Sequence, residues 1–328
     1  RYAEYIDLFK DFKTVSDLLR GARTKRGSID FDLPESKVIL DKNGKAVDIK
    51  PYDRNAATKL IEDFMLAANE TVAEDFFWQD IPFLYRVHEN PDPEKMKSLA
   101  IFINNFGFTL RRKNDEVSPK ELQKLLANIE GSDAEPIISR IALRSMKQAR
   151  YDTVCVGHFG LAAKYYTHFT SPIRRYPDLQ IHRIIKENIK KGLSSRRIEH
   201  YRAILDSVAL QSSQMERRAE EAERETVKYK KCEYMLNHIG EEFDGIISGV
   251  TGFGIFVELE NTVEGFIKMA DLEGDYFVYN EAGYELVGEI TKKKFVLGQK
   301  VRVKVYDIDR LAKRIDFKLV KEKNGRGD

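Results

Sequence analysis

The spacing of apolar residues divides the chain into a long helical region and a shorter region of strands. Before residue 240 the apolar positions recur every three to four residues, which is typical of amphipathic helices. After Glu241 they alternate with polar positions in short runs between glycines, which is typical of strands. The pattern therefore predicts domains at 1–239 and 240–320, followed by a polar tail at 321–328.

Helices dominate the first region, with a few extended segments between them. Helices are predicted over residues 5–19, 54–77, 94–105, 119–129, 135–150, 177–191 and most of 194–238. Strands are predicted at Gly27–Leu33 and Lys37–Ile49, the second with Asn43-Gly44 as a hairpin turn. A short extended piece is expected at Ile81–His88, and residues 157–177 have the composition of a loop.

The second region predicts a small all-β domain closed into a barrel. The expected fold class is therefore α+β, with helices packed on a partial sheet followed by an all-β barrel.

Composition and charge narrow the class of protein without identifying it. The 328 residues are 42% hydrophobic and 33% charged, and the net charge of +2 requires any nucleic-acid site to be a local patch. Cys155 and Cys232 predict reduced thiols and a cytoplasmic location, and no apolar run predicts a membrane span. The start at Arg1, with no Met, is typical of an excised fragment.

The most informative segment is His168-Phe-Thr-Ser-Pro-Ile-Arg-Arg-Tyr-Pro-Asp-Leu179. Two prolines stiffen the turn that carries Arg174 and Arg175, and a helix is predicted to begin near Pro177. Guanidinium groups and a helix start both suit phosphate oxygens, which predicts a phosphate-binding turn. Alternatively, Asp178 pairs with one arginine and the segment only leads into the helix.

This segment resembles the signature of the RNB family of 3′→5′ exoribonucleases. Further blocks resemble that family in the same order along the chain, namely Arg26-Gly-Ser-Ile-Asp-Phe31, Leu60–Asn69, Tyr85-Arg-Val-His88, Arg144–Ala149, Gly157–Leu161 and Glu216-Arg-Arg218. The resemblance implies that residues 1–239 are the C-terminal portion of an RNB domain.

The resemblance also implies roles for individual residues. Arg174 matches the arginine beside the scissile phosphate, and Glu223 matches another acid of the catalytic site. Phe31 matches an aromatic that stacks on 3′-terminal bases, and Glu62 an acid near the last nucleotide, while Arg175 is a further RNA-binding candidate. The alternatives are that Phe31 belongs to the core and that Glu62 pairs with Lys59 on its own helix.

One expected feature of the family is missing from this chain. RNB enzymes hold Mg²⁺ with closely spaced aspartates, and these lie upstream of the segment that aligns with Arg1. Neither Asp30 with Asp32 nor Asp271 with Asp275 forms a comparable cluster, so no metal ligand is predicted here. The scattered histidines are expected to be structural, namely His88, His158, His168 and His182.

The β region resembles an S1-type RNA-binding domain of the OB fold, through Gly245–Leu259 and Glu264–Lys268. Phe253 and Phe256 lie on either side of Gly254 and are predicted to form a stacking platform for bases, with Phe253 exposed. The alternative is that one of the two rings belongs to the barrel core. The candidate phosphate contacts are Lys268, Arg302 and Lys304.

These resemblances imply a function and its partners. The intact protein is expected to release 5′-mononucleotides from single-stranded 3′ ends of RNA, including structured RNA, with Mg²⁺ as cofactor. This chain alone is expected to be inactive and to need an upstream segment or chain. The alternatives are a non-catalytic RNA-binding module acting through the barrel and an inactive structural fragment.

Overall fold

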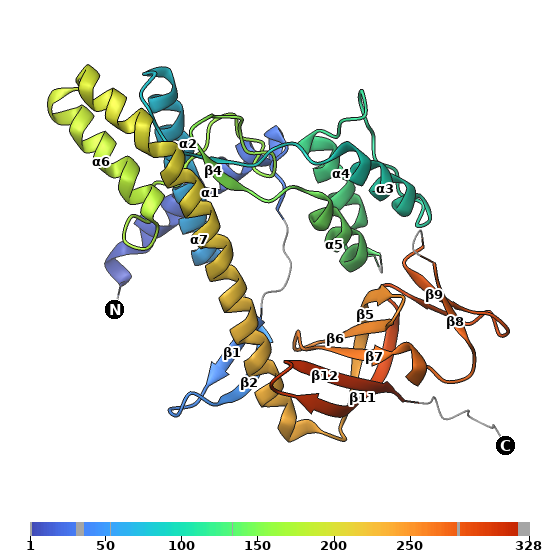
Figure 1. Ribbon diagram of the computed structural model, residues 1–328. Coiled ribbons are helices and arrows are strands. Elements are labelled where there is room, and N and C mark those ends of the chain that lie inside the picture. Colours follow the sequence, from blue (N-terminus) through green and yellow to red (C-terminus); the bar gives the residue numbers. More distant parts are fainter. Residues whose placement is uncertain (1, 31–35, 53, 133, 281–282, 321–328) are drawn as a thin grey trace. The chain divides into compact units, whose positions relative to one another are not determined.

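The computed structural model describes residues 2–30, 36–52, 54–132, 134–280 and 283–320 (Figure 1). Its described residues form two compact units of the expected α+β class. The first unit lies within residues 1–31, 54–130 and 138–219, and the second within residues 32–53, 131–137 and 220–328.

Seven α-helices occupy most of the described residues before position 240. Their bounds are α1 Ile6–Arg26, α2 Ala56–Trp78, α3 Pro93–Asn104, α4 Pro119–Ile129, α5 Glu135–Ser145, α6 Tyr176–Lys191 and α7 Ser195–Met235. Side-chain caps fix several starts, because Asn55, Asp92 and Ser118 each accept a hydrogen bond from a free N–H of the first turn. The predicted helices are confirmed, and residues 195–235 form one continuous helix.

Two sequence predictions in the first unit are wrong. No strand begins at Gly27: residues 27–30 are irregular, because Gly27 ends α1 in a left-handed conformation (φ 107°) and the Ser28 N–H caps the Arg23 carbonyl. The end of the predicted strand, 31–33, lies outside the described residues. Helix α5 ends at Ser145 rather than at 150, because β4 (Arg150–Asp152) pairs with β3 (Tyr85–Val87).

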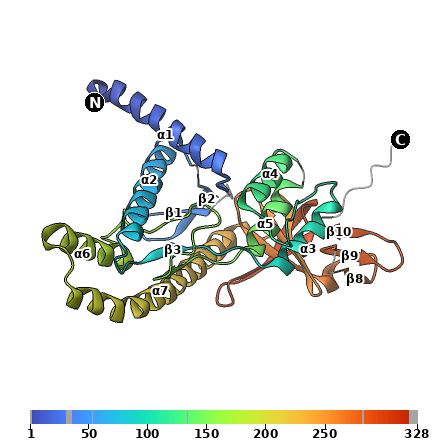
Figure 2. The ribbon, with the colours of Figure 1, turned by 90° about the horizontal axis from the view of Figure 1, so that it is seen from above.

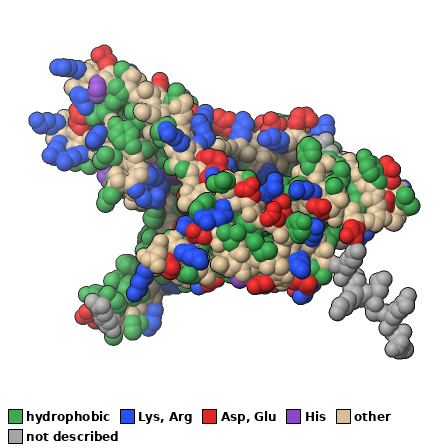
Figure 3. Space-filling model, turned by 60° about the horizontal axis from the view of Figure 1, so that its bottom comes forward, with side chains coloured by type: hydrophobic (Ala, Val, Ile, Leu, Met, Phe, Trp, Pro, Cys, Tyr) green, Lys and Arg blue, Asp and Glu red, His purple; other side chains and the backbone are tan. Residues whose placement is uncertain are grey.

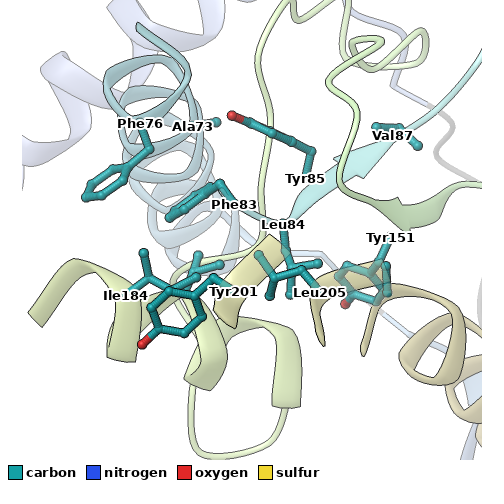
Figure 4. Packing of buried hydrophobic residues seen from close by; sticks show 12 residues of the cluster. Ala73, Phe76, Phe83, Leu84, Tyr85, Val87, Tyr151, Ile184, Tyr201 and Leu205 are labelled. Atoms are coloured by element: carbon teal, nitrogen blue, oxygen red, sulfur yellow. The ribbon is translucent and has the colours of Figure 1, made fainter. Parts of the chain in front are cut away.

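A core of buried aromatic and aliphatic side chains anchors the segment that carries the arginine turn. Phe76 of α2 stacks on Phe83 with ring centroids 4.7 Å apart. Figure 4 shows Phe83 between this ring and the side chains of Ile184 and Tyr201, which come from α6 and α7. Arg197 of α7 binds Glu187 of α6, and the two helices lie side by side in Figures 1 and 2. The start of α6 is therefore fixed on a rigid base.

The second unit contains a closed five-stranded barrel with the strand order β11-β12-β7-β6-β5. Its strands are β5 Glu242–Thr251, β6 Gly254–Leu259, β7 Glu264–Lys268, β11 Lys300–Asp309 and β12 Arg314–Leu319. The barrel was predicted, whereas the small sheet inserted between β7 and β11 was not. That sheet consists of β8 Phe277–Asn280, β9 Glu285–Gly288 and β10 Lys294–Val296.

The second unit also holds the predicted hairpin of β1 (Ser36–Leu40) and β2 (Ala46–Pro51). Asp41 braces its turn by accepting hydrogen bonds from the N–H groups of Asn43 and Lys45. Gly44 occupies the left-handed region there, with φ 77°.

Acidic and basic side chains are interspersed over the surface that Figure 3 presents. This agrees with the small net charge of +2. No helix among the described residues is long and apolar enough to cross a membrane.

Candidate functional site

The turn before α6 is built around the buried carboxylate of Asp178. Its Oδ2 atom accepts the Ser171 N–H (2.8 Å) and pairs with the Arg175 guanidinium (2.8 Å). The Ser171 carbonyl closes the turn by accepting the N–H groups of Arg174 (3.3 Å) and Arg175 (3.0 Å). Pro177 lies in the first turn of α6, as expected. One carboxylate thus fixes the shape of the whole turn.

The two arginines of the turn have different environments. The side chain of Arg175 is 18% exposed and bound to Asp178, so the predicted pairing of Asp178 with one arginine is confirmed. Arg174 is exposed, and no described residue forms an ion pair with it. A free guanidinium on a braced turn can bind an anion with little loss of conformational freedom, which suits Arg174 to the phosphate contact predicted for it.

A layer of histidine and tyrosine rings lies behind this turn. His168 Nδ1 and the Tyr151 hydroxyl are 2.8 Å apart, and ring contacts continue through Tyr166 to His158 and His88. Burial, reinforced by the Arg175 guanidinium, lowers the pKa of His168 to about 2. Burial likewise lowers the pKa of His158 to about 3. These rings are neutral near pH 7.

Each of the four histidines has a hydrogen-bonding contact, as expected for histidines with a structural role. His88 and His158 each accept a main-chain N–H through Nδ1, at 3.1 and 3.3 Å. His182 stacks on Phe169 and its Nε2 lies 2.8 Å from the Phe169 carbonyl. Asn69 of α2 binds both the Phe169 N–H and the Tyr166 hydroxyl, so α2 and α6 hold the same loop.

The structure brings an acid to this region that the sequence did not single out. Glu216 of α7 binds Arg86 at 2.5 Å. The pKa of Tyr151 is raised mainly by burial and also by the negative charge of Glu216. Glu223, the acid named from the sequence, is exposed on α7, and no described residue pairs with it. The sequence feature that could have identified Glu216 is the segment Glu216-Arg-Arg218, which resembles the RNB family.

Glu62, another RNB candidate, lies near the start of α2. Glu62 pairs with Arg54 (2.8 Å), not with Lys59, and Arg54 also binds Asp30 (3.1 Å). Phe31 and Asp32 lie outside the described residues. Glu62 thus belongs to a network of ion pairs in the chain segments that flank Phe31.

The barrel presents aromatic rings on the outer face of β6 and β7. Phe253 is 82% exposed at the β5–β6 turn, as predicted. Phe256 is half-buried, and its ring centroid lies 4.8 Å from that of Phe266 on the neighbouring strand. Both rings alternate with core residues such as Ile255 and Ile267 and therefore point outward. Phe266 was missed in the sequence, although it alternates in the same way.

Gly254 makes the close approach of the two strands possible. A Cβ atom at this position would lie 2.1 Å from the Ile267 carbonyl oxygen, and the residue has φ 150°. The Phe253 carbonyl accepts the Met269 N–H (2.8 Å), which ties the aromatic turn to the end of β7. The three rings and Lys268 therefore lie on the same side of the barrel, on β6, β7 and the turn that precedes β6.

The basic candidates of the barrel differ in their freedom to bind phosphate. Lys268 is exposed and lies 3.7 Å from Asp316. Arg302 contacts both Glu242 (3.1 Å) and Asp244 (3.4 Å). Lys304 is exposed and has no ion pair with a described residue. The aromatic rings beside Lys268 form a surface that can stack on bases and contact a sugar–phosphate backbone.

The described residues do not fit the Mg²⁺ that the family resemblance implies. They include no group of three or more His, Cys, Asp or Glu side chains that could hold a metal ion. Asp275 instead braces a loop, since it accepts hydrogen bonds from the N–H groups of Ile290 and Thr291.

Comparisons with known proteins agree with this organisation. The RNB domain matches residues 2–191, and the S1 RNA binding domain matches residues 237–319. Ribonuclease R 1 of Lactococcus lactis is 43% identical over 316 residues, covering 96% of this chain and 39% of that protein. The chain spans 39–46% of the length of the curated relatives it matches.

Solved structures give the same result. Mycoplasma genitalium RNase R in complex with ribose methylated single-stranded RNA has a TM-score of 0.90 and 30% identity, covering 96% of this chain and 50% of that chain. The same enzyme in complex with double-stranded RNA has a TM-score of 0.81 and 27% identity, covering 95% of this chain and 50% of that one.

The chain therefore belongs to the RNB family, with an S1 domain following the RNB domain. Within that family its homologues are the ribonuclease R proteins, at 35–43% identity over nearly its whole length. This confirms the resemblance found in the sequence, which was closest to bacterial ribonuclease R.

Proposed function

We propose that the intact protein is a processive, hydrolytic 3′→5′ exoribonuclease that releases 5′-mononucleotides. In this proposal the present chain supplies the phosphate-binding turn and an RNA-binding barrel. The observation that carries it is the exposed Arg174, which has no ion pair with a described residue, on a turn braced by Asp178 in a chain homologous to ribonuclease R.

Arg174 would stabilise negative charge on the phosphate oxygens at the cleaved bond. The acid of the site would be Glu216 rather than Glu223, because Glu216 pairs with Arg86, whose guanidinium lies 4.8 Å from the centre of the Tyr151 ring, and Tyr151 contacts His168 behind the turn. Arg175 would act through the shape of the turn, since Asp178 occupies its guanidinium. Glu62 and Phe31 would contact the terminal nucleotides.

Mg²⁺ would be held by residues outside this chain, because the described residues contain no suitable group of ligands. We therefore expect the chain to be inactive by itself. A segment or second chain that completes the site would cover apolar surface, and helix α1 offers such surface. Its exposed apolar residues are Ile6, Leu8, Phe9, Phe12, Val15 and Leu18.

The activity is tested with single-stranded RNA, Mg²⁺ and two forms of the protein. The protein with its upstream RNB segment should release 5′-mononucleotides, and this chain alone should release none. In the active form, Arg174→Ala should lower the rate by about 10²–10³-fold, as expected for loss of one donor to a developing anion. Arg196→Ala, at an exposed position of α7, is the matched control. Mononucleotides released by this chain alone would contradict the inference about the metal ligands.

A second candidate function is RNA binding without catalysis, through the barrel. The platform of Phe253, Phe256 and Phe266 favours it, because all three rings belong to this chain. In a titration of single-stranded RNA against this chain, Phe253→Ala should then weaken binding while Arg174→Ala has little effect. A larger loss with Arg174→Ala would favour the exonuclease assignment.

The substrates would be single-stranded 3′ ends, including those of structured RNA. Solved complexes of an RNase R homologue with single-stranded and with double-stranded RNA support this range of substrates. The two free cysteines agree with a cytoplasmic location.

A further inference from the structure

The β1–β2 hairpin carries an unusual concentration of unpaired positive charge. Its lysines are Lys37, Lys42, Lys45 and Lys50. All four are exposed, and none forms an ion pair with a described residue. Of the two acids in the hairpin, Asp41 is engaged by the N–H groups of the turn. With Asp48 as the second acid, four lysines against two aspartates leave the hairpin with a net charge of +2, and no described residue forms an ion pair with these lysines.

Two of these lysines are direct cross-strand partners. Lys37 faces Lys50 in the antiparallel register. Like charges placed directly opposite each other destabilise a pair of strands, so the arrangement has an energetic cost in the free protein. A bound polyanion would remove that cost.

Hydrogen bonds fix the hairpin within the second unit, to α7 and to the barrel. The Ala46 N–H binds Glu233 of α7 (3.0 Å), and Lys230 donates to the Gly44 carbonyl (2.5 Å). Ser36 binds Thr262, in the loop between β6 and β7, at 2.8 Å. Ser36, which directly precedes Lys37, is therefore attached to the β6–β7 loop. This loop lies at the opposite end of β6 from the turn that carries Phe253.

We propose that the β1–β2 hairpin is a second contact for the RNA sugar–phosphate backbone, made mainly by Lys37 and Lys50. RNA that stacks on Phe256 and Phe266 and continues along β6 and β7 would reach the lysine pair beyond the β6–β7 loop. The inference rests on the proposed RNA-directed function. It predicts that the hairpin contacts only RNA that is longer than the roughly 4–16 nucleotides covered by one barrel of this fold.

The test measures binding by the complete 328-residue chain to single-stranded RNA of about 4 and about 30 nucleotides over a range of salt concentrations, because one OB fold covers at most about 16 nucleotides. The double substitution Lys37→Gln/Lys50→Gln removes two phosphate contacts. It should lower the salt dependence, d log K/d log[salt], by about 1.4 for the longer RNA. At 0.1 M salt this corresponds to a rise in Kd of up to about 25-fold, since 0.1 to the power −1.4 is about 25. Binding of the short RNA should not change.

Lys190→Gln/Lys191→Gln, at the exposed end of α6, is the matched control for charge and should leave both measurements unchanged. Lys37→Glu gives a further check, because it creates an ion pair with Lys50 while removing positive charge. It should raise the melting temperature and still weaken binding of the long RNA. A purely structural role of the lysines cannot produce that combination.

Three results would overturn the inference. One is an equal affinity of the Lys37→Gln/Lys50→Gln variant and the native chain for long RNA. Another is an equal loss in the two charge-matched variants. A third is unchanged RNA binding together with self-association of the variant, which would identify the lysines as guards against strand pairing at the hairpin edge. If the native chain binds neither RNA, the proposed function itself fails.

Discussion

The braced turn before α6 gives a sharp prediction about stability. Asp178→Asn keeps the size of the side chain but removes the charge that pairs with Arg175. The Asp178 side chain is fully buried and that of Arg175 only 18% exposed, so the substitution leaves a nearly buried guanidinium without its counter-ion. Breaking a buried pair in this way costs about 3–5 kcal/mol, and the residual exposure of Arg175 places the loss near 3 kcal/mol.

This loss can be measured by urea unfolding. With a slope of about 2–3 kcal/mol per molar urea, a loss of about 3 kcal/mol lowers the midpoint by about 1–1.5 M. Trp78 is the only tryptophan of the chain and lies at the end of α2, so its fluorescence reports on the unit that contains the turn.

Two further variants separate the ion pair from other effects. Arg174→Gln changes the exposed neighbour and should move the midpoint by less than about 0.25 M, as for most surface substitutions. Arg175→Met combined with Asp178→Asn removes both charges and should recover at least half of the lost stability. If Asp178→Asn unfolds at the same urea concentration as the native chain, or if the double variant recovers nothing, the buried pair does not hold the turn.

Three other predictions concern acidity, the barrel and the platform. Because the pKa values of His158 and His168 lie at about 3 and about 2, below the unfolded value near 6.5, their stabilisation is complete above about pH 6.5. This stabilisation is lost on acidification, at up to about 1.4 kcal/mol per pH unit for each ring. The urea midpoint should therefore be lower at pH 5 than at pH 7, and His168→Gln should reduce this difference. Gly254→Ala should destabilise the barrel in thermal unfolding, whereas Gly252→Ala, with open space around its Cβ, should not. Phe266→Ala should weaken RNA binding by about 1–3 kcal/mol in a titration with little change in its salt dependence, and a changed salt dependence would refute stacking.

The sequence predicted the main helices and the barrel because their apolar periods are long and regular. The strand predicted to begin at Gly27 was wrong. The alternating residues after this glycine suggested a strand, whereas Gly27 ends helix α1. The sheet of β8 to β10 was missed because its strands are only three or four residues long. Local patterns of that length do not determine which segments pair.

Candidate residues were easier to find than their partners. The signature around Arg174 pointed to the turn, but periodicity cannot show which of two adjacent arginines is buried. The contact between Glu216 and Arg86 joins residues 130 positions apart. Glu62 pairs with Arg54, whereas the sequence had suggested Lys59 on its own helix as the partner. Such contacts depend on tertiary packing, which a local pattern does not contain.

The alternation of an outward and an inward arginine also limits how this turn can evolve. Ser171 and Asp178 meet across seven positions, and that spacing decides that Arg174 faces solvent while Arg175 faces the carboxylate. Deleting or inserting one residue between them would move both arginines relative to the carboxylate without removing either. The number of residues in this segment should therefore be more strictly preserved than the identity of Ile173, whose side chain is fully exposed.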